Sequence, residues 1–150
     1  MCAVSTLFML PHAGQRSSVA AAARHLRPGG VLFIEAFRSD PRRFDAHGQR
    51  TEHRPGPAGP HTVRSRHDPA ARSISITHLL GEPDGSTSEY LVTLHYSSLA
   101  ELDAMAAAAD LVLAARWHDW DRGPLRPDST DPVSVYRRAG LASAPLMRPG

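Results

Sequence analysis

The segment His25–Phe37 constrains the fold more than any other part of this chain. It closes a helical pattern at Leu26, turns at Pro28-Gly29-Gly30 and continues as the apolar run Val31–Ile34 before reaching Glu35. A short apolar run behind a glycine turn is typical of a buried central strand in an α/β sheet. An acid at the end of such a strand lies at the carboxyl edge of the sheet, where open α/β folds bind their ligands. We therefore expect an α/β fold with a ligand site near Glu35.

The residues before this segment supply the other parts of a strand–helix–strand unit. Residues 2–10 are mostly apolar and predict a strand, and Pro11-His12-Ala13-Gly14 interrupts it. A helix is expected from about Gln15 to Leu26, with an apolar face made of Val19, Ala20, Ala23 and Leu26. Two strands joined by a helix in this way should be parallel.

The middle of the chain changes composition and then begins to alternate. From residue 38 to 61 it is rich in Arg, Pro, Gly and Asp, and residues 54–60 read Arg-Pro-Gly-Pro-Ala-Gly-Pro. Because proline lacks the backbone donor of a sheet ladder, we expect a loop there. Residues 62–96 show period-two alternation and predict three antiparallel strands with one covered side. The inward sets would be Ile74, Ile76, His78 and Leu80, and Tyr90, Val92, Leu94 and Tyr96.

The last third predicts a helix followed by two strands. Ser98 and Glu101 have the spacing of a capping box and open the helix. Asp110 should end it in a left-handed conformation, which Asp tolerates better than most residues. Strands are expected from Leu111 to Ala115 and from Val133 to Tyr136, and residues 139–150 as coil.

Positive charge is concentrated in one segment. All 17 basic residues are Arg, and residues 38–72 hold eight of them against Asp40, Asp45, Glu52 and Asp68. We interpret this segment as a solvated, Arg-rich loop, with a salt-sensitive nucleic-acid surface as the alternative. Only Phe44 interleaves the arginines, so no aromatic stacking platform for bases is visible. No nucleic-acid partner is therefore expected.

Cysteine usage and hydropathy indicate the compartment. Cys2 is the single cysteine, which excludes an internal disulfide and fits a reducing environment. No run approaches the roughly 18 apolar residues of a membrane span, and the N-terminus lacks a basic signal-peptide region. We expect a cytoplasmic protein without membrane contact.

Several pieces of the chain resemble the second half of class I S-adenosylmethionine-dependent methyltransferases. The matching pieces are Cys2-x-x-Ser5-Thr6, Leu26-x-Pro-Gly-Gly30, Val31–Glu35, Asp84-Gly85 and Leu94-x-Tyr96-x-x-x-x-Glu101-Leu102. The resemblance implies that residues 2–8 and 31–37 are central strands of a Rossmann-like sheet. Residues 111–118 and 132–137 would then be its closing antiparallel pair. Residues 1–138 would form a partial methyltransferase domain, in which 62–96 is the antiparallel insertion that covers the substrate in small-molecule enzymes such as amino-sugar N-methyltransferases.

The resemblance also implies a cofactor, S-adenosylmethionine. In that family a glycine-rich turn and an acid in the first half of the domain hold it, but no Gly-x-Gly-x-Gly occurs here. The function implied is methyl transfer to a small molecule by an enzyme truncated of its cofactor-binding N-terminal half, and we expect no binding of the cofactor by this chain alone. The alternative is a non-catalytic remnant or interaction module that pairs, with itself or another chain, through an exposed edge of its N-terminal strand.

The same resemblance implies a set of site residues. Val4 and Ser5 would lie near the methionine part of the cofactor, and the substrate would contact Met9, Glu35, Phe37 and Tyr96. Met9 stands where the amino-sugar enzymes carry a proton-accepting His, which argues against that exact substrate.

The candidate proton acceptors are Glu35, His12 and His95, and each has a structural alternative. Glu35 could instead pair with an Arg such as Arg38. His12 could be a solvated loop residue, and His95, like His78, a half-buried sheet residue. No metal is expected, because the His and acidic residues lack ligand spacing. Methyl transfer requires an aligned donor and acceptor rather than a covalent intermediate, so a site without a prominent motif is consistent with it.

Overall fold

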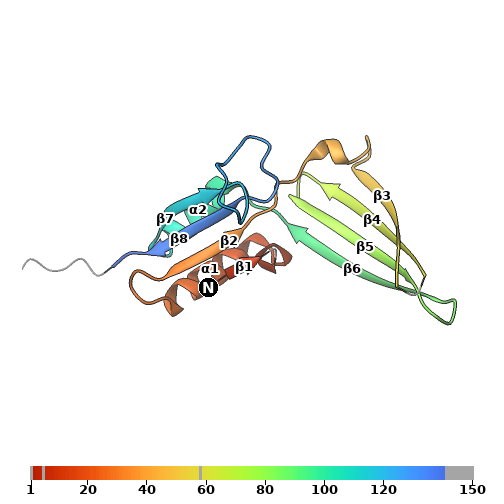
Figure 1. Cartoon of the computed structure of the whole chain (residues 1–150), viewed down its shortest axis with the longest axis horizontal. Helices are drawn as coiled ribbons and strands as arrows, with labels where there is room; N and C mark the ends of the chain where they lie inside the picture. Colours follow the sequence, from red (N-terminus) through yellow and green to blue (C-terminus); the bar gives the residue numbers. More distant parts are fainter. Residues whose placement is uncertain (1, 5, 58, 141–150) are drawn as a thin grey trace, which may run out of the picture.

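The computed structural model describes residues 2–4, 6–57 and 59–140, which form two lobes joined side by side (Figure 1). The first lobe holds a four-stranded sheet in the order β1-β2-β8-β7. Its strands are β1 (Cys2–Val4), β2 (Val31–Glu35), β7 (Leu111–Trp117) and β8 (Val133–Arg138). Helices α1 (His12–His25) and α2 (Leu99–Ala107) pack on it. The α/β class expected from the sequence is confirmed.

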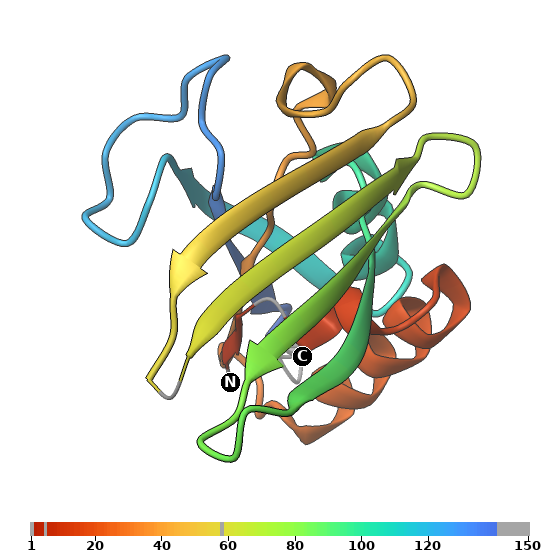
Figure 2. The ribbon, with the colours of Figure 1, turned by 90° about the vertical axis from the view of Figure 1, so that its right-hand side faces the viewer.

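The second lobe is a four-stranded antiparallel sheet in the order β3-β4-β5-β6. Its strands are β3 (Gln49–Pro55), β4 (Pro60–Asp68), β5 (Ser73–Gly81) and β6 (Thr87–His95). Figure 2 looks onto this sheet, with the helices and the other sheet behind it. We call the side that carries Val63 and Ile74 its inner face, because both side chains line a cavity together with Phe37 of the first lobe.

The predicted unit of two parallel strands around a helix is confirmed. β1 pairs with β2 in parallel, with Ala3 opposite Ile34. One side of β2, through Leu32 and Ile34, is buried in the hydrophobic core of the first lobe. The helices supply Val19 and Leu102 to the same core. Burial of apolar surface on one side of the sheet therefore places β2 centrally, as its sequence predicted.

The strand predicted over residues 2–10 is confirmed for residues 2–4 and wrong for residues 6–10. Residues Thr6–Met9 form a 3-10 helix (η1) instead. Leu7 and Phe8 are buried, and the Phe8 ring meets Phe37 edge-on with centroids 5.4 Å apart. The apolar run therefore packs into the hydrophobic core and does not continue along the sheet edge.

The helix predicted from Gln15 begins earlier, at His12, directly after Pro11. Gly14 does not interrupt it. A Cβ at Gly14 would lie 3.1 Å from the Cβ of Leu10, so the glycine leaves room for Leu10, which lies between η1 and α1. His12 is thus a helix residue and not the loop residue of the alternative interpretation.

The long loop predicted over residues 38–61 is also wrong, because it contains β3. The turn before β3 ends at Gly48, whose φ is +71° and whose added Cβ would lie 2.7 Å from the His67 carbonyl oxygen. Pro55 and Pro60 face each other at the far end of the β3–β4 hairpin. β3 is an edge strand, where a missing proline donor costs little. The sheet therefore has four strands, whereas the alternation over residues 62–96 predicted three.

The last third follows the prediction closely. Ser98 and Glu101 form a reciprocal capping box at the start of α2. Asp110 has a φ of +58° just after the helix. β7 and β8 are antiparallel, and β7 runs two residues further than expected, to Trp117. Most of the coil predicted over residues 139–150 lies outside the described residues.

The arginines of residues 38–72 do not share one surface. Strand register places Arg50 and Arg54 on the inner face of the β3–β6 sheet, and Arg64 and Arg66 on the outer face. These four arginines therefore do not form a single basic stripe of the kind that follows a nucleic-acid backbone. Within the described part of the chain, no helix is long and apolar enough to cross a membrane.

Candidate functional site

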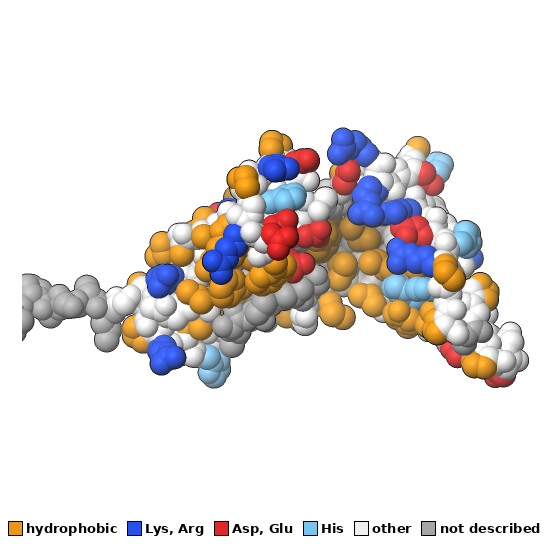
Figure 3. Space-filling view, in the orientation of Figure 1, with side chains coloured by type: hydrophobic (Ala, Val, Ile, Leu, Met, Phe, Trp, Pro, Cys, Tyr) orange, Lys and Arg blue, Asp and Glu red, His pale blue; other side chains and the backbone are white. Residues whose placement is uncertain are grey.

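Two chain segments cross between the lobes and define the candidate site. Residues 36–39 lead from β2 into the second lobe, and residues 96–98 lead from β6 back to α2. A cavity of about 900 Å³ lies against both segments, and Phe37 and Tyr96 contribute to its wall. A second cavity, of about 300 Å³, lies on the inner face of the β3–β6 sheet and shares Phe37, Arg38 and Ser39 with the first. Figure 3 shows the surface hollowed between the lobes, with apolar side chains in the hollow.

We call the place where residues 36–39 and 96–98 cross between the lobes the junction. Aromatic contacts fix its shape. The Phe37 ring meets the Tyr96 ring edge-on, with centroids 6.2 Å apart. The Tyr96 hydroxyl lies 2.9 Å from Nε2 of His67, and the Ser39 hydroxyl lies 3.3 Å from the same nitrogen. Burial raises the pKa of Tyr96 above its usual 10. Its hydroxyl therefore stays protonated at neutral pH and can donate to His67.

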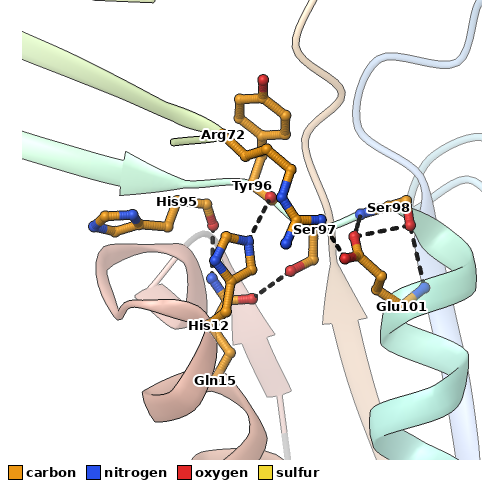
Figure 4. Close-up of polar contacts among 8 residues, drawn as sticks. All are labelled: His12, Gln15, Arg72, His95, Tyr96, Ser97, Ser98 and Glu101. Atoms are coloured by element: carbon orange, nitrogen blue, oxygen red, sulfur yellow. Dashed lines mark hydrogen bonds and ion pairs between the residues drawn. The ribbon is translucent and has the colours of Figure 1, made fainter. Parts of the chain in front are cut away.

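A buried amide holds the end of β6 against the start of α1 (Figure 4). Gln15 is fully buried, and its Nε2 donates to the carbonyl oxygens of Leu10, at 2.9 Å, and His95, at 2.6 Å. The buried Ser97 hydroxyl donates to Gln15 Oε1 at 2.8 Å. His12 Nε2 lies 3.1 Å from the Tyr96 carbonyl oxygen, and only a protonated Nε2 can donate there. His12 is consequently a backbone anchor in this arrangement, with that nitrogen unavailable as a base.

An ion pair connects the second lobe to α2. Arg72, in the β4–β5 turn, pairs through Nη1 with Glu101 Oε1. The other Glu101 oxygen, Oε2, accepts from the backbone and hydroxyl of Ser98. The Arg72 bond and the Ser98 bonds lower the pKa of Glu101 to about 2. Arg72 and Glu101 separate the larger cavity from a third one, of about 480 Å³, that reaches His12.

Glu35 lies apart from these groups. The Trp120 indole N–H donates to Glu35 Oε2 at 2.5 Å. The Trp120 ring lies beside Phe33, with centroids 6.0 Å apart. Arg38, the ion-pair partner of the alternative interpretation, instead donates to the carbonyl oxygens of Pro127 and Ser129 at 2.5 and 3.5 Å. The carboxylate therefore ends β2 as expected, with an indole as its partner.

The residues predicted for the site form separate groups. Phe37 and Tyr96 share the larger cavity. His12 and His95 lie close to one another, with ring centroids 6.3 Å apart. Met9 ends η1 with 53% of its surface exposed. Val4 is the last residue of β1, and Ser5 lies outside the described residues.

The sequence reasoning missed Gln15, His67 and the inner-face arginines. A signal existed for Gln15: it precedes Val19 by one helical turn, so it is a polar residue on the apolar face of α1. Such a position indicates a buried, hydrogen-bonded amide. For His67, the alternation of its strand predicts only that its side chain lies on the same face as Val63. It does not predict a hydrogen-bond partner after β6.

The connection between β1 and α1 lacks the glycine-rich turn that the resemblance associates with S-adenosylmethionine. The connection from β1 to α1 passes through η1, whose sequence is Thr-Leu-Phe-Met, and contains no glycine-rich turn. The first turn of α1 is bound to the end of β6 through His12 and Gln15. No cluster of three or more metal-ligating side chains occurs among the residues that the structure describes.

Comparison with solved structures identifies S-adenosylmethionine-dependent methyltransferases as structural neighbours. The CcbJ methyltransferase from Streptomyces caelestis matches with 31% identity and a TM-score of 0.80, over 93% of this chain and 56% of CcbJ. CalS10, an amino pentose methyltransferase from Micromonospora echinaspora, matches with 23% identity and a TM-score of 0.62, over 92% of this chain and 58% of CalS10. The resemblance to this class of enzyme is confirmed.

A more distant neighbour shares the fold alone. It is an S-adenosylmethionine-dependent methyltransferase from Clostridium acetobutylicum, with 8% identity and a TM-score of 0.73, over 93% of this chain and 56% of the neighbour. The chain thus spans a little more than half the length of the structures it matches. No protein-family model and no curated protein matches the sequence.

Proposed function

We propose that this chain is the substrate-facing part of an S-adenosylmethionine-dependent methyltransferase that acts on a small molecule. The similarity to CcbJ, at 31% identity over 93% of this chain, carries the proposal. In it the β1-β2-β8-β7 sheet is the second half of a Rossmann-like methyltransferase sheet. The β3–β6 sheet is the layer that covers the methyl acceptor.

The chain's own residues would bind and orient the acceptor. Phe37 and Tyr96 give the larger cavity an apolar wall, and His67 holds the protonated Tyr96 hydroxyl in place. Such a site can align an acceptor and exclude water, which an in-line displacement requires. Glu35 Oε2 and His12 Nε2 are each engaged by another group, so positioning is the contribution that we assign to these two residues. His95 remains the candidate proton acceptor.

Complementation tests this proposal. The first half of CcbJ would be fused before Cys2, and binding of S-adenosylmethionine would be measured by titration calorimetry for the fusion and for the chain alone. We expect no measurable binding by the chain alone, because it lacks the glycine-rich turn and the ribose-binding acid. Each lost hydrogen bond to a charged group weakens binding by roughly 1.5–3 kcal/mol, which is about tenfold or more.

The fusion should bind the cofactor in the micromolar range, as each half then supplies its own side of the crevice. A folded fusion that binds no cofactor would count against the proposal. Tight binding by the chain alone would show that it contains a cofactor site of a different kind. Fusion of the same CcbJ segment to an unrelated α/β domain is the matched control.

An interaction module is the second candidate function, and the position of β1 favours it. Among the described strands β1 pairs only with β2 and lies at the edge of its sheet. An open edge offers backbone donors and acceptors to a further strand. The chain would then act by association through β1.

A further inference from the structure

The inner face of the β3–β6 sheet carries an arrangement of charges that lies outside the contacts holding the two lobes together. Arg50, Glu52 and Arg54 alternate along β3, so their side chains share this face. Glu52 forms an ion pair with Arg50 through Oε1, at 2.5 Å, and accepts a hydrogen bond from Arg54 Nε on Oε2, at 3.1 Å. Two guanidinium groups thus share one carboxylate.

The charge balance of this cavity is positive. Arg38, Arg43, Arg50 and Arg54 line it, against the carboxylates of Asp40 and Glu52, which leaves two positive charges in excess. Asp40 is in addition held by Arg42 at 2.9 Å. An arginine has five N–H donors in a fixed plane, so a pair of them bound to one carboxylate retains donors for a second oxyanion.

Hydrogen bonding, burial and charge together shift the pKa values of two groups that line this cavity. The Arg54 hydrogen bond, followed by the charges of Arg50, Arg54 and Arg43, lowers the pKa of Glu52 despite its partial burial. Burial, and then the charges of His61 and Arg54, lowers the pKa of His78. His78 therefore stays neutral at physiological pH, and the guanidinium groups provide the positive charge.

Much of the remaining wall of the cavity is apolar. Val63, Ile74 and Ile76 line it from β4 and β5, Phe37 from the segment after β2 and Phe44 from the segment before β3. Figure 3 shows basic, acidic and His side chains following one another beside the apolar hollow. The volume of about 300 Å³ is at the lower end of the range for small-molecule sites.

We propose that this cavity binds the anionic group, a carboxylate or a phosphate ester, of a small molecule with an apolar body, through Arg50 and Arg54. Glu52 holds the two guanidinium groups on the same face of the sheet until the anion arrives. The inference rests on the proposed function only in taking this molecule to be the methyl acceptor. Binding itself needs no cofactor.

Binding of three probes with the same ring tests the proposal on the chain as it is. Phenyl phosphate, benzoate and neutral benzamide would be titrated into the protein and followed by NMR chemical shifts of β3–β5 amides. At least one anion should bind more tightly than benzamide by about tenfold or more, since charge-assisted hydrogen bonds distinguish them. The tighter of the two anions identifies the oxyanion class.

Substitutions separate recognition from folding. Arg50→Ala and Arg54→Ala should each weaken anion binding about 10- to 100-fold. The matched controls are Arg64→Ala and Arg66→Ala, on the outer face of the same sheet, and they should leave anion binding unchanged. Glu52→Gln should tighten anion binding, because it removes the competing carboxylate. A purely structural triad would not produce that gain.

Equal binding of benzamide and both anions, or no binding of either anion at millimolar concentration, would overturn the proposal. So would equal losses in the inner-face and outer-face variants. If Arg50→Ala does not fold, the more exposed Arg54 and Glu52→Gln still decide the outcome. Cofactor binding by the CcbJ fusion is a separate readout, so failure here leaves the proposed function standing.

Discussion

At the scale of single residues, buried polar side chains hold the junction between the lobes. Gln15 uses both ends of its amide, donating to the Leu10 and His95 carbonyl oxygens and accepting from Ser97. These bonds join the start of α1 to the last residues of β6. A buried amide that is fully satisfied in this way specifies one docking geometry, because any shift would leave polar groups unpaired.

Replacing Gln15 by Ala should destabilise the protein by about 2–4 kcal/mol, through the lost hydrogen bonds, the unpaired Ser97 hydroxyl and the cavity left behind. Urea denaturation would measure the change in the free energy of unfolding. Ser97→Ala should lower the free energy of unfolding by less, since it removes only the hydrogen bond to Gln15. The double variant should show a coupling of about 0.5–3 kcal/mol between the two sites. Additive effects would contradict the network, and the exposed Gln49→Ala is the control.

At the scale of elements, α2 is positioned by its N-terminal cap as much as by its apolar face. The Ser98–Glu101 capping box starts the helix, and Arg72 binds the same carboxylate from the β4–β5 turn. Local sequence therefore begins the helix, whereas a long-range ion pair attaches it to the second lobe.

The lowered pKa of Glu101 predicts a pH dependence of stability. Its value falls from 4.5 to about 2 in the folded protein. A carboxyl with a lowered folded pKa stabilises the protein above its unfolded pKa, and this contribution is lost as the pH falls through the folded value. Wild type should therefore exceed Glu101→Gln in stability at pH 6, and the difference should shrink between about pH 4.5 and 2.

Solvent screening limits the size of this effect. The Glu101 side chain is 36% exposed, so we expect a difference of about 1 kcal/mol at pH 6. Arg72→Ala should reproduce most of the loss, because it removes the main cause of the pKa shift. Thermal melts across this pH range would measure both variants, with Arg64→Ala as the control. A difference that is constant with pH would contradict the assignment.

At the scale of the whole molecule, two sheets of different kinds meet along crossing segments instead of merging into one layer. The first lobe keeps its core between one side of its sheet and the two helices. The second lobe contributes an inner face that is partly apolar and partly charged. The two cavities that share Phe37, Arg38 and Ser39 therefore lie where the lobes adjoin.

The edge position of β1 predicts self-association, which the interaction-module hypothesis requires. Light scattering should show a mass that rises with protein concentration. Successive N–H groups of a strand point to opposite sides, so one of the variants Ala3→Pro and Val4→Pro removes an outward donor while the other breaks pairing with β2. The outward variant should lower association without lowering the melting temperature.

A monomer at high concentration would contradict this prediction. The edge is only three residues long, because η1 folds Leu7 and Phe8 into the core. We therefore expect weak, millimolar-range association rather than a stable dimer.

Elements with a local chemical cause were predictable. The glycine turn before β2, the capping box of α2 and the left-handed Asp110 follow from backbone sterics and hydrogen bonds within a few residues. The short β1 and the strand β3 were not predictable in this way. η1 depends on burial of Phe8 against Phe37, and β3 on an edge position that tolerates Pro55.

The sequence by itself determined the α/β class, the central strand β2, the resemblance to methyltransferases and the absence of a glycine-rich cofactor turn, since each depends on neighbouring residues. Only the tertiary structure decided which side chains meet. It paired Tyr96 with His67, Glu35 with Trp120 and Gln15 with Ser97, from positions 29 to 85 residues apart. Contacts across such separations depend on how the lobes pack, because the register of one sheet against another element is set by burial over the whole surface and not by local spacing.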